Sequence, residues 1–445
     1  MSAGRHLFLA VPGLALLVLE LAGLHFQRSD AFPWFIATAL AQGAVYFVAA
    51  FWVASRRPSP LWLVLLFAVL LRLPPLLSPP HLSTDAYRYV WDGRVQAAGI
   101  NPYRYVPAAP ELKALRDERI YPQINRREYA VTIYPPAAQL FFLATTRLSE
   151  SVTWMKSAIL ACEGLAIWML LLLLRRAGRA DAEVLLYAWH PLAIWEFAGS
   201  GHVDAAAIAC VLAALLARAR GRSALAGAAL GLGALFKLYP LVLLPALWRR
   251  RDFRMPAALA ATIAVGYLPY LGVGPGVLGF LPAYVREEGL QSGSRYYLLQ
   301  LAERLSSVHL HPAVYLVPAG LVLAALSVWV LCRRQPEESL ARDSLLLATA
   351  AVLAVSPHYA WYFAWLLPLA TLTSCTPVLL LGVNSFVLYW FLLEESASTT
   401  LYTGTLIVLP FALLLLYRAA RTRRTVQGII PVSREAGHVD ADPAP

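Results

Sequence analysis

Long apolar runs separated by short polar stretches fill most of this 445-residue chain. Runs of 17 to 25 predominantly apolar residues with few charges are typical of transmembrane helices. The pattern predicts spans, some of them short, at 7–26, 32–54, 61–77, 155–174, 183–198, 204–218, 223–237, 239–248, 256–271, 312–332, 343–356, 358–374, 377–393 and 401–418. We therefore expect an all-α polytopic membrane protein with about 11 to 14 crossings.

One polar excursion, residues 78–133, interrupts the apolar pattern. Within it, Ser83-Thr84 are good N-cap residues and Gly99 is a stop signal, so the sequence predicts a helix of about four turns that begins near Asp85. Spacings of three and four residues place four polar side chains on one helix face, with aromatic residues round the side. These four are Asp85, Arg88, Asp92 and Gln96. The pattern is that of an amphipathic helix suited to a membrane surface.

The simplest interpretation of this face is a solvated surface with an Arg88–Asp92 ion pair. The rest of the loop favours a functional role, because aromatic and charged residues stay interleaved as far as Tyr134-Pro135-Pro136. Loops that carry function have this character.

Composition agrees with a membrane protein. Apolar residues make up 59% of the chain and charged residues 14%, against roughly 45–50% and 25% in soluble domains. No soluble domain larger than the 78–133 loop fits anywhere in the pattern. Cys162, Cys210, Cys332 and Cys375 lie in or beside apolar runs without CxxC spacing, so we interpret them as small buried side chains.

The net charge of +11 points to membrane topology and not to a nucleic-acid partner. The basic residues form short clusters between apolar runs, as the positive-inside rule predicts for cytoplasmic loops. These clusters lie at 56–57, 175–179, 218–222, 249–254, 333–334 and 418–424. All of these clusters lie on the cytoplasmic side of the membrane only if 135–148, which is short for a span, is a re-entrant or interfacial helix.

This topology divides the chain into four parts. We expect N-terminal transmembrane helices over 1–77, an extracytoplasmic loop with interfacial and re-entrant helices over 78–154, a transmembrane bundle over 155–420, and a disordered cytoplasmic tail over 421–445. Nearly all polar residues of chemical interest then face away from the cytoplasm.

Polar residues at the mouths of spans are further candidates. His202 and Asp204 follow a small-residue turn, so both can point into one cavity, although Asp204 is equally well explained as a helix cap. Lys237 ends an apolar span and is either a snorkelling lysine or a phosphate contact. His358 and Tyr359 follow Pro357; an aromatic belt explains the tyrosine, whereas the imidazole needs a polar partner.

Two carboxylates, Glu20 and Glu163, lie inside apolar runs, where a charge is costly. A neighbouring helix that carries a cation would neutralise such a group. Arg72, near the outer end of the span 61–77, and Arg295 are cations expected on the outer side.

Taken together, these motifs resemble the GT-C membrane glycosyltransferases, and most closely the family 87 polyprenyl-phosphate-mannose-dependent mannosyltransferases. The resemblance covers about residues 60–370 and rests on an ordered set of motifs. These are Asp85-Ala86-Tyr87-Arg88-Tyr89, Trp91-Asp92-Gly93-Arg94, Gly99-Ile100-Asn101-Pro102-Tyr103, Tyr134-Pro135-Pro136, Gly201-His202-Val203-Asp204, Lys237-Leu238-Tyr239-Pro240 and Pro357-His358-Tyr359.

The resemblance implies a GT-C-type bundle with a large first extracytoplasmic loop that carries the catalytic aspartate, Asp85 in this chain. It also implies inverting transfer of a sugar, mannose at family level, from a polyprenyl-phosphate donor to a lipid-linked or glycan acceptor, at a multi-pass cell membrane. No cofactor is expected. Thr84-Asp85-Ala86 stands where the family often has paired acidic residues, which favours a metal-independent reaction.

The chemistry of inversion supports these roles, because it needs one carboxylate base and a cation for the departing phosphate. We expect Asp85 to be the base, and the candidates for donor phosphate or substrate are Arg88, Arg94, His202, Asp204, Lys237, His358 and Tyr359, with Asp92 and Tyr134 in support. Two other classes stay open: a polytopic flippase or transporter, and a glycan polymerase or ligase that uses lipid diphosphate donors.

Overall fold

The computed structural model describes residues 3–27, 31–55, 59–333, 339–394 and 396–427, and within these ranges it is helical without strands. This confirms the all-α fold class. The helices of the bundle as far as residue 236 are α1 (Ala3–Gln27), α2 (Phe32–Ala54), α3 (Leu61–Leu70), α4 (Leu73–Leu77), α7 (Val152–Arg176), α10 (Asp204–Ala219) and α11 (Ser223–Phe236). They are followed by α12 (Leu244–Leu247), α13 (Arg254–Tyr267), α16 (Ala313–Cys332), α17 (Leu340–Val355), α18 (Leu366–Thr373), α19 (Thr376–Asn384) and α20 (Ala397–Gln427).

The described part of the chain holds 6 helical segments long and apolar enough to cross a membrane. They are Phe8–Gln27, Phe32–Ala54, Val152–Arg176, Arg254–Glu287, Ala313–Cys332 and Ser398–Ala420. Shorter apolar helices lie at 61–77, 223–236, 360–373 and 376–392. The chain is therefore a polytopic membrane protein, and the larger number of crossings stays a prediction.

Several predicted spans fold as a series of short helices and not as one continuous helix. The predicted span 183–198 contains Pro191, which has no N–H for a helix interior. This region folds as η3 (Asp181–Val184), α8 (Leu185–Ala188), α9 (Pro191–Ala193) and η4 (Ile194–Gly199). Similar breaks give η5 (Tyr239–Leu243), η8 (Ala360–Phe363) and η9 (Ser385–Leu392).

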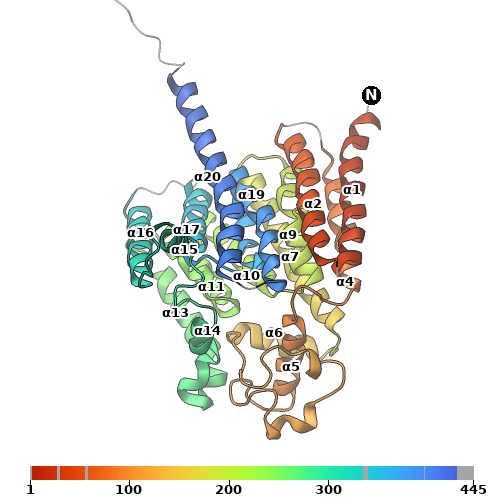
Figure 1. Cartoon of the computed structure of the whole chain (residues 1–445), viewed down its shortest axis with the longest axis vertical. Coiled ribbons are helices and arrows are strands. Elements are labelled where there is room, and N and C mark those ends of the chain that lie inside the picture. Colours follow the sequence, from red (N-terminus) through yellow and green to blue (C-terminus); the bar gives the residue numbers. More distant parts are fainter. Residues whose placement is uncertain (1–2, 28–30, 56–58, 334–338, 395, 428–445) are drawn as a thin grey trace, which may run out of the picture.

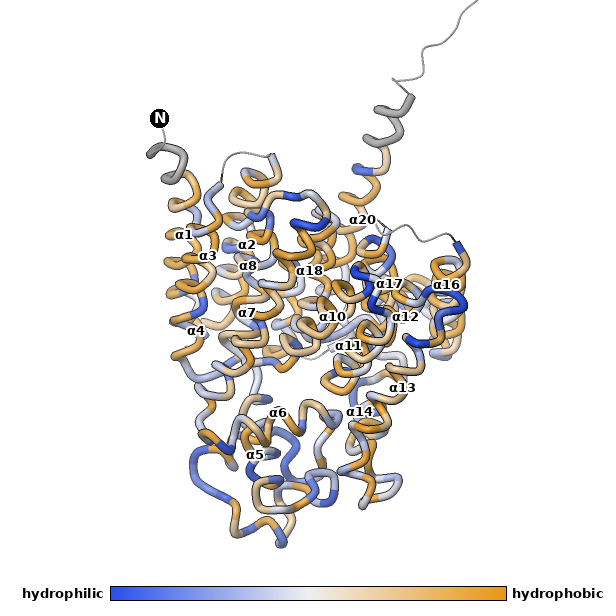
Figure 2. Tube along the Cα trace, turned by 180° about the vertical axis from the view of Figure 1, so that it is seen from behind, coloured by the Kyte–Doolittle hydropathy of each residue, from blue (hydrophilic) through white to orange (hydrophobic). Residues whose placement is uncertain are grey.

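The polar loop folds into a compact unit at one end of the bundle (Figure 1). Its helices are α5 (Asp85–Ala97), η1 (Pro110–Leu115), η2 (Tyr121–Gln123) and α6 (Pro136–Thr146). Figure 2 shows that this unit is markedly more hydrophilic than the bundle above it. At 11 residues, α6 is too short to cross a bilayer, in line with the interfacial or re-entrant helix that the sequence predicts.

Helix α5 begins and ends as predicted, but its charged face is not exposed. It begins at Asp85, and Gly99 ends the turn that follows it with a left-handed φ of 77°. Arg88 and Asp92 are buried together with Trp91, because α5 packs against α6 and α7. The helix expected to lie on a membrane surface is instead a core element of the loop unit.

A second segment, from the C-terminal half, reaches the same end of the molecule. It consists of η6 (Leu268–Leu278) and α14 (Leu281–Glu287), after which α15 (Tyr297–Ser306) packs against α16 and α20 in the bundle. The backbone N–H of Phe280 donates to the carbonyl oxygen of Thr132 at 3.0 Å, which joins this segment to the loop unit. Gly279, with φ 58°, allows the approach, since a Cβ there would lie 2.0 Å from the Thr132 oxygen.

Inside the bundle, Arg72 forms a bidentate pair with Glu163. Its Nε and Nη2 atoms lie 2.7 and 2.5 Å from the two carboxylate oxygens, and both side chains are buried. Nη1 of Arg72 donates to the carbonyl oxygens of Ala68 and Ala188. The predicted need of Glu163 for a partner on a neighbouring helix is thus met.

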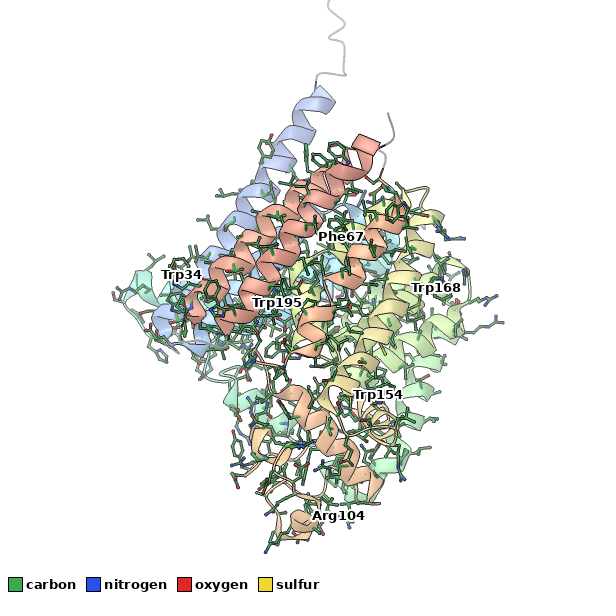
Figure 3. The ribbon with its side chains drawn as sticks, turned by 90° about the vertical axis from the view of Figure 1, so that its right-hand side faces the viewer. Trp34, Phe67, Arg104, Trp154, Trp168 and Trp195 are labelled. Carbon is green, nitrogen blue, oxygen red and sulfur yellow. The ribbon has the colours of Figure 1, made fainter. Side chains whose placement is uncertain are left out.

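The first described turn of α1 and the far end of α20 lie at the end of the bundle opposite α5 and α6 (Figure 1). Figure 3 shows α7 leading from Trp154, near the loop unit, up to Trp168, while Arg104 marks the tip of the loop unit. Helix α20 continues to Gln427, so residues 421–427 of the predicted tail are helical. The rest of that tail, 428–445, lies outside the described residues.

Candidate functional site

A cavity of about 660 Å³ lies between the loop unit and the adjacent end of the bundle. The loop contributes residues between His81 and Pro135, and the bundle contributes the turns after α11 and α17. Of the sequence candidates, Asp85, Arg88, Tyr134, Lys237 and Tyr359 line it. The remainder of the wall is largely apolar and comes from η6, α14, α17, η8 and η9.

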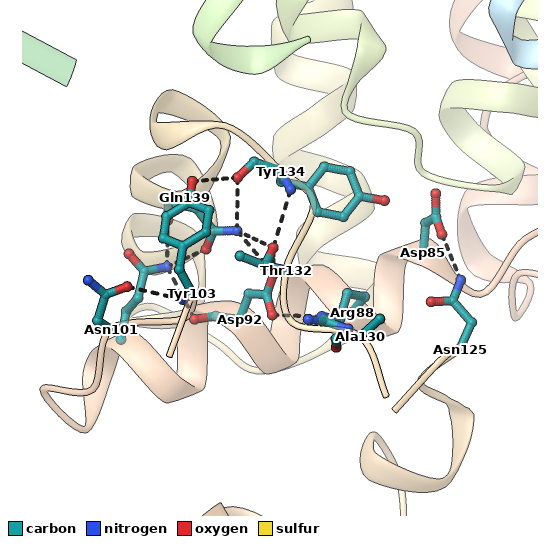
Figure 4. A network of polar contacts seen from close by, with 11 residues as sticks. Asp85, Arg88, Asp92, Asn101, Tyr103, Asn125, Ala130, Thr132, Tyr134 and Gln139 are labelled. Atoms are coloured by element: carbon teal, nitrogen blue, oxygen red, sulfur yellow. Dashed lines mark hydrogen bonds and ion pairs between the residues drawn. The ribbon is translucent and has the colours of Figure 1, made fainter. Parts of the chain in front are cut away.

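Asp85 stands at the start of α5 with both carboxylate oxygens in defined surroundings. Nδ2 of Asn125 donates to its Oδ1 at 2.9 Å (Figure 4). Its Oδ2 lies 3.8 Å from Nδ1 of His202. The side chain is only 16% exposed, so this carboxylate is held in a largely desolvated wall of the cavity.

The charge state of Asp85 follows from these neighbours. Burial raises the pKa of Asp85, whereas His202 and Lys237 lower it. Hydrogen bonds from Asn125 and Tyr134 lower it further, and the pKa of Asp85 ends below its ordinary value. Because burial lowers the pKa of His202 to about 4, that ring is neutral at pH 7 and the positive charge near Asp85 is that of Lys237.

His202 and Asp204 meet at the site because of the turn that precedes α10. Gly201 adopts φ 73°, and a Cβ there would lie 2.7 Å from Cγ of Lys156, so this tight turn requires glycine. Both side chains are fully buried behind the cavity wall. Nε2 of His202 lies 3.4 Å from Oε2 of Glu196.

Lys237 ends α11 and forms a buried ion pair. Its Nζ lies 3.2 Å from Oδ2 of Asp204 and 5.5 Å from the centre of the Tyr134 ring. Burial lowers the pKa of Lys237, but Asp204 raises it above its ordinary value, so the ammonium stays charged. The lysine therefore points into the protein toward Asp204 and is not a freely snorkelling side chain.

Asp92 has the supporting position that its spacing suggests. Its Oδ1 accepts from Nε of Arg88 at 2.8 Å, and its Oδ2 accepts from Thr132 and Gln139 at 2.5 and 3.0 Å (Figure 4). Arg88 also donates to the carbonyl oxygen of Ala130 at 3.2 Å. This network locks the chain leading to Tyr134 against α5.

An aromatic row borders the cavity on the bundle side. The Trp361 ring stacks on His202 with centroids 4.3 Å apart and on Tyr359 at 4.4 Å. The hydroxyl of Tyr359 donates to Oε1 of Glu288 at 3.2 Å. Planar rings with polar ends are suited to holding an amphipathic ring such as a sugar.

Two of the sequence candidates lie away from the cavity. Arg94 pairs with Asp117 and Glu150 at 2.7 and 2.8 Å on the outside of the loop unit. His358 stacks on Phe391 at 4.6 Å and lines a separate cavity of about 40 Å³. The structure thus gathers Asp85, Arg88, Tyr134, Lys237 and Tyr359 with the flanking His202 and Asp204, but not Arg94 or His358.

Four residues at the site escaped the sequence analysis. Asn125, Arg126, Glu196 and Trp361 lie at the cavity or directly behind it. Asn125 and Arg126 follow no spacing rule, and Trp361 is indistinguishable from a belt residue in sequence. Glu196 did carry a signal, because it is a carboxylate inside a predicted span, as Glu20 and Glu163 are.

No group of three or more His, Cys, Asp or Glu residues that could hold a metal ion occurs in the ranges that the structure describes. The chemistry accessible to the residues at the cavity is proton transfer at Asp85 and electrostatic stabilisation of an anion by the neighbouring cations.

Comparison with known proteins identifies a family. The family model described as "Alpha-(1->6)-mannopyranosyltransferase, N-terminal domain" matches residues 9–249, more than half of the chain. A comparison with curated proteins finds no match. The matched region contains the first spans, the whole polar loop and the His202 and Lys237 turns. The chain therefore belongs to the alpha-(1->6)-mannopyranosyltransferase family of glycosyltransferases.

Proposed function

We propose that the protein transfers a mannosyl group, with inversion, from a polyprenyl-phosphate donor to a lipid-linked or glycan acceptor on the extracytoplasmic side of the cell membrane. The observation that carries this proposal is the position of Asp85. A carboxylate with a lowered pKa lies at the wall of a cavity beside a lysine and an aromatic row. Such a carboxylate is ionised at neutral pH and can accept the proton of a sugar hydroxyl.

In this reaction the bond between the anomeric carbon and the donor phosphate breaks, and a bond to the acceptor oxygen forms on the opposite face of the sugar. Asp85 accepts the proton of the acceptor hydroxyl, and the electron pair leaves with the phosphate. Lys237 stabilises the charge that develops on the phosphate. Tyr359 and Trp361 border the space for the sugar ring, while Asn125 and His202 position the base.

The apolar wall of the cavity supports a lipid-linked donor. It includes Leu278, Val355 and Leu392, whose side chains are 51%, 47% and 54% exposed. An apolar path from the cavity to the lipid phase would accept a prenyl chain, which is costly to expose to water.

The basic clusters and the arrangement of the helices support an outward-facing site. Arg175 and Arg176 end α7 away from the loop unit (Figure 3), and cytoplasmic ends carry such residues. The loop unit then faces the other side of the membrane.

The test is to incubate the purified protein in nanodiscs with a panel of polyprenyl-phosphate sugars and an acceptor-lipid extract, and to measure donor consumption. We expect polyprenyl-phosphate mannose to be consumed and a single sugar to be transferred. Consumption of a lipid diphosphate donor instead would point to a polymerase or ligase. Uptake of solute by sealed liposomes that contain the protein, without donor consumption, would point to a transporter.

A further inference from the structure

The charges at the cavity wall are unequally available to an incoming anion. Among the described residues that line it, the arginine and lysine side chains are Arg88, Arg126 and Lys237. Each is paired with a carboxylate, so the property that separates them is how firmly the partner holds the cation.

Arg88 and Lys237 are held by fully buried partners. The Asp92 side chain is 2% exposed and that of Asp204 is 0% exposed. Separating either pair would leave a buried carboxylate without its cation, which is strongly unfavourable. These two cations contribute a fixed positive field but are not free to rearrange around a ligand.

Arg126 is held differently. Its Nε lies 2.5 Å from Oε1 of Glu287, and the two side chains are 26% and 33% exposed. Its Nη2 reaches Oε1 of Glu288 only at 3.5 Å, and that carboxylate is shared with Arg295. Ion pairs with this degree of exposure contribute little to stability, so the exchange of Glu287 for another anion is inexpensive.

The backbone places Arg126 in the same cavity wall as the proposed base. Asn125 donates to Asp85, and the next residue, Arg126, has φ 53°. This left-handed conformation is uncommon for arginine. It directs consecutive side chains to Asp85 and to the Glu287 pair.

We infer that Arg126 binds the phosphate of the lipid-linked donor, and that Glu287 occupies the guanidinium when the cavity is empty. This inference rests on the proposed function, since it assumes a phosphate-bearing donor. Guanidinium groups bind phosphate through paired charge-assisted hydrogen bonds, a geometry that Lys237 does not offer. Glu287 is then a competitor of the donor, not a support for it.

The segment that carries Glu287 has other attachments, which makes the inference testable by substitution. Phe280 bonds to Thr132, and the Tyr284 and Tyr362 hydroxyls lie 3.0 Å apart. Loss of the Glu287 charge therefore leaves α14 in place. Arg127, adjacent in sequence, pairs with Glu128 at 2.9 Å and does not line the cavity, so it provides a matched control.

The experiment measures binding of farnesyl phosphate by isothermal titration calorimetry to the full chain in nanodiscs of neutral lipid, with farnesol as the uncharged probe. Arg126→Gln should weaken farnesyl phosphate binding by about 10- to 100-fold, the effect of losing charge-assisted hydrogen bonds. Glu287→Gln should strengthen it by about two- to fivefold, because a weakly held competitor is removed. Arg127→Gln should leave farnesyl phosphate binding unchanged, and farnesol binding should be equal in all variants.

The opposite effects of Arg126→Gln and Glu287→Gln on binding distinguish a Glu287 that competes with the donor from an ion pair that is only structural. If Arg126→Gln and Glu287→Gln both weaken binding and both lower the melting temperature, the pair is only structural and the inference is wrong. If the wild type binds farnesyl phosphate and Arg126→Gln does not weaken it, the inference fails while the proposed donor class stands. If the wild type binds farnesyl phosphate no better than farnesol, the proposed donor class itself fails, and the inference with it.

Discussion

Asn125 donates a hydrogen bond of 2.9 Å to Asp85, although 40 residues separate them in the sequence. The bond fixes Oδ1 and the plane of the carboxylate. Oδ2 is left 3.8 Å from the His202 ring, beyond ordinary hydrogen-bond distance. Together with the Tyr134 hydroxyl, the Asn125 bond keeps the group oriented, and Oδ2 makes no hydrogen bond to His202, so it can accept a proton from a substrate hydroxyl.

The first prediction concerns this carboxylate. Asp85→Asn keeps the shape of the side chain and removes the proton acceptor, so turnover should fall by a factor of about 10² to 10⁴. Binding of the donor and the melting temperature should change little. Single-turnover kinetics with a radiolabelled donor would measure the first effect and calorimetry the second.

The matched comparison is Asp92→Asn, one turn further along the same helix. Asp92 is 1% exposed and accepts three hydrogen bonds, so its neutralisation leaves Arg88 as an uncompensated buried charge. A loss of about 3 to 5 kcal/mol of stability is expected, with a smaller effect on the turnover of the folded fraction. If Asp85→Asn keeps near-normal turnover and Asp92→Asn loses more of it, then Asp85 is not the base.

Local signals were sufficient to predict the helix that carries both aspartates. Ser83 and Gly99 bracket α5, and the three- and four-residue spacing predicts the Arg88–Asp92 contact. Its burial was not predictable, because it depends on α6 and α7 folding over it. The same holds for Asn125 and Glu287, whose partners lie 40 and 161 residues away in sequence, since no periodicity links such distant positions.

The second prediction compares Lys237 with His358. Lys237→Met should weaken donor use by about 10- to 100-fold, because it removes a cation at the cavity. His358→Gln should stay near the wild type, since this ring lies against Phe391 outside the main cavity. Donor titrations of both variants make the comparison. If His358→Gln weakens donor use more than Lys237→Met does, then His358 and not Lys237 contacts the donor.

Stability should depend on pH through His202. Burial lowers its pKa to about 4, whereas an unfolded imidazole has a pKa of about 6.5. Below pH 6.5 the unfolded state therefore binds more protons, and stability falls as pH falls toward 4. Between pH 7 and pH 5 the loss amounts to about 2 kcal/mol.

The measurement is the difference in melting temperature between pH 7 and pH 5, for the wild type and for His202→Gln. The variant has no titrating group at this position, so its difference should be smaller even if its stability at pH 7 is lower. Equal differences in the two proteins would mean that the ring at 202 has the same pKa in the native state as in the unfolded chain.

The buried pair Arg72–Glu163 yields a prediction about the bundle. Glu163→Leu alone leaves the Arg72 guanidinium without its carboxylate and should destabilise the protein by about 3 to 5 kcal/mol. The double variant Arg72→Met, Glu163→Leu removes both charges and should recover most of that loss. Thermal unfolding monitored by tryptophan fluorescence compares them. A double variant no more stable than the single one would show that the ion pair itself stabilises the helices.

The last prediction concerns the side of the membrane on which the cavity opens. The four natural cysteines are first replaced by serine or alanine, and single cysteines are then placed at Arg104 and at Ala177, both of which are exposed. Arg104 lies at the tip of the loop unit, and Ala177 follows the opposite end of α7 (Figure 3).

In intact cells, or in spheroplasts if an outer layer blocks access, a membrane-impermeant maleimide should label Arg104→Cys only. Labelling of Ala177→Cys should require permeabilised membranes, because the arginines beside it favour the cytoplasm. The reverse result would place the cavity on the cytoplasmic side, and the proposed extracytoplasmic reaction would have to be abandoned even if mannosyl transfer itself were confirmed.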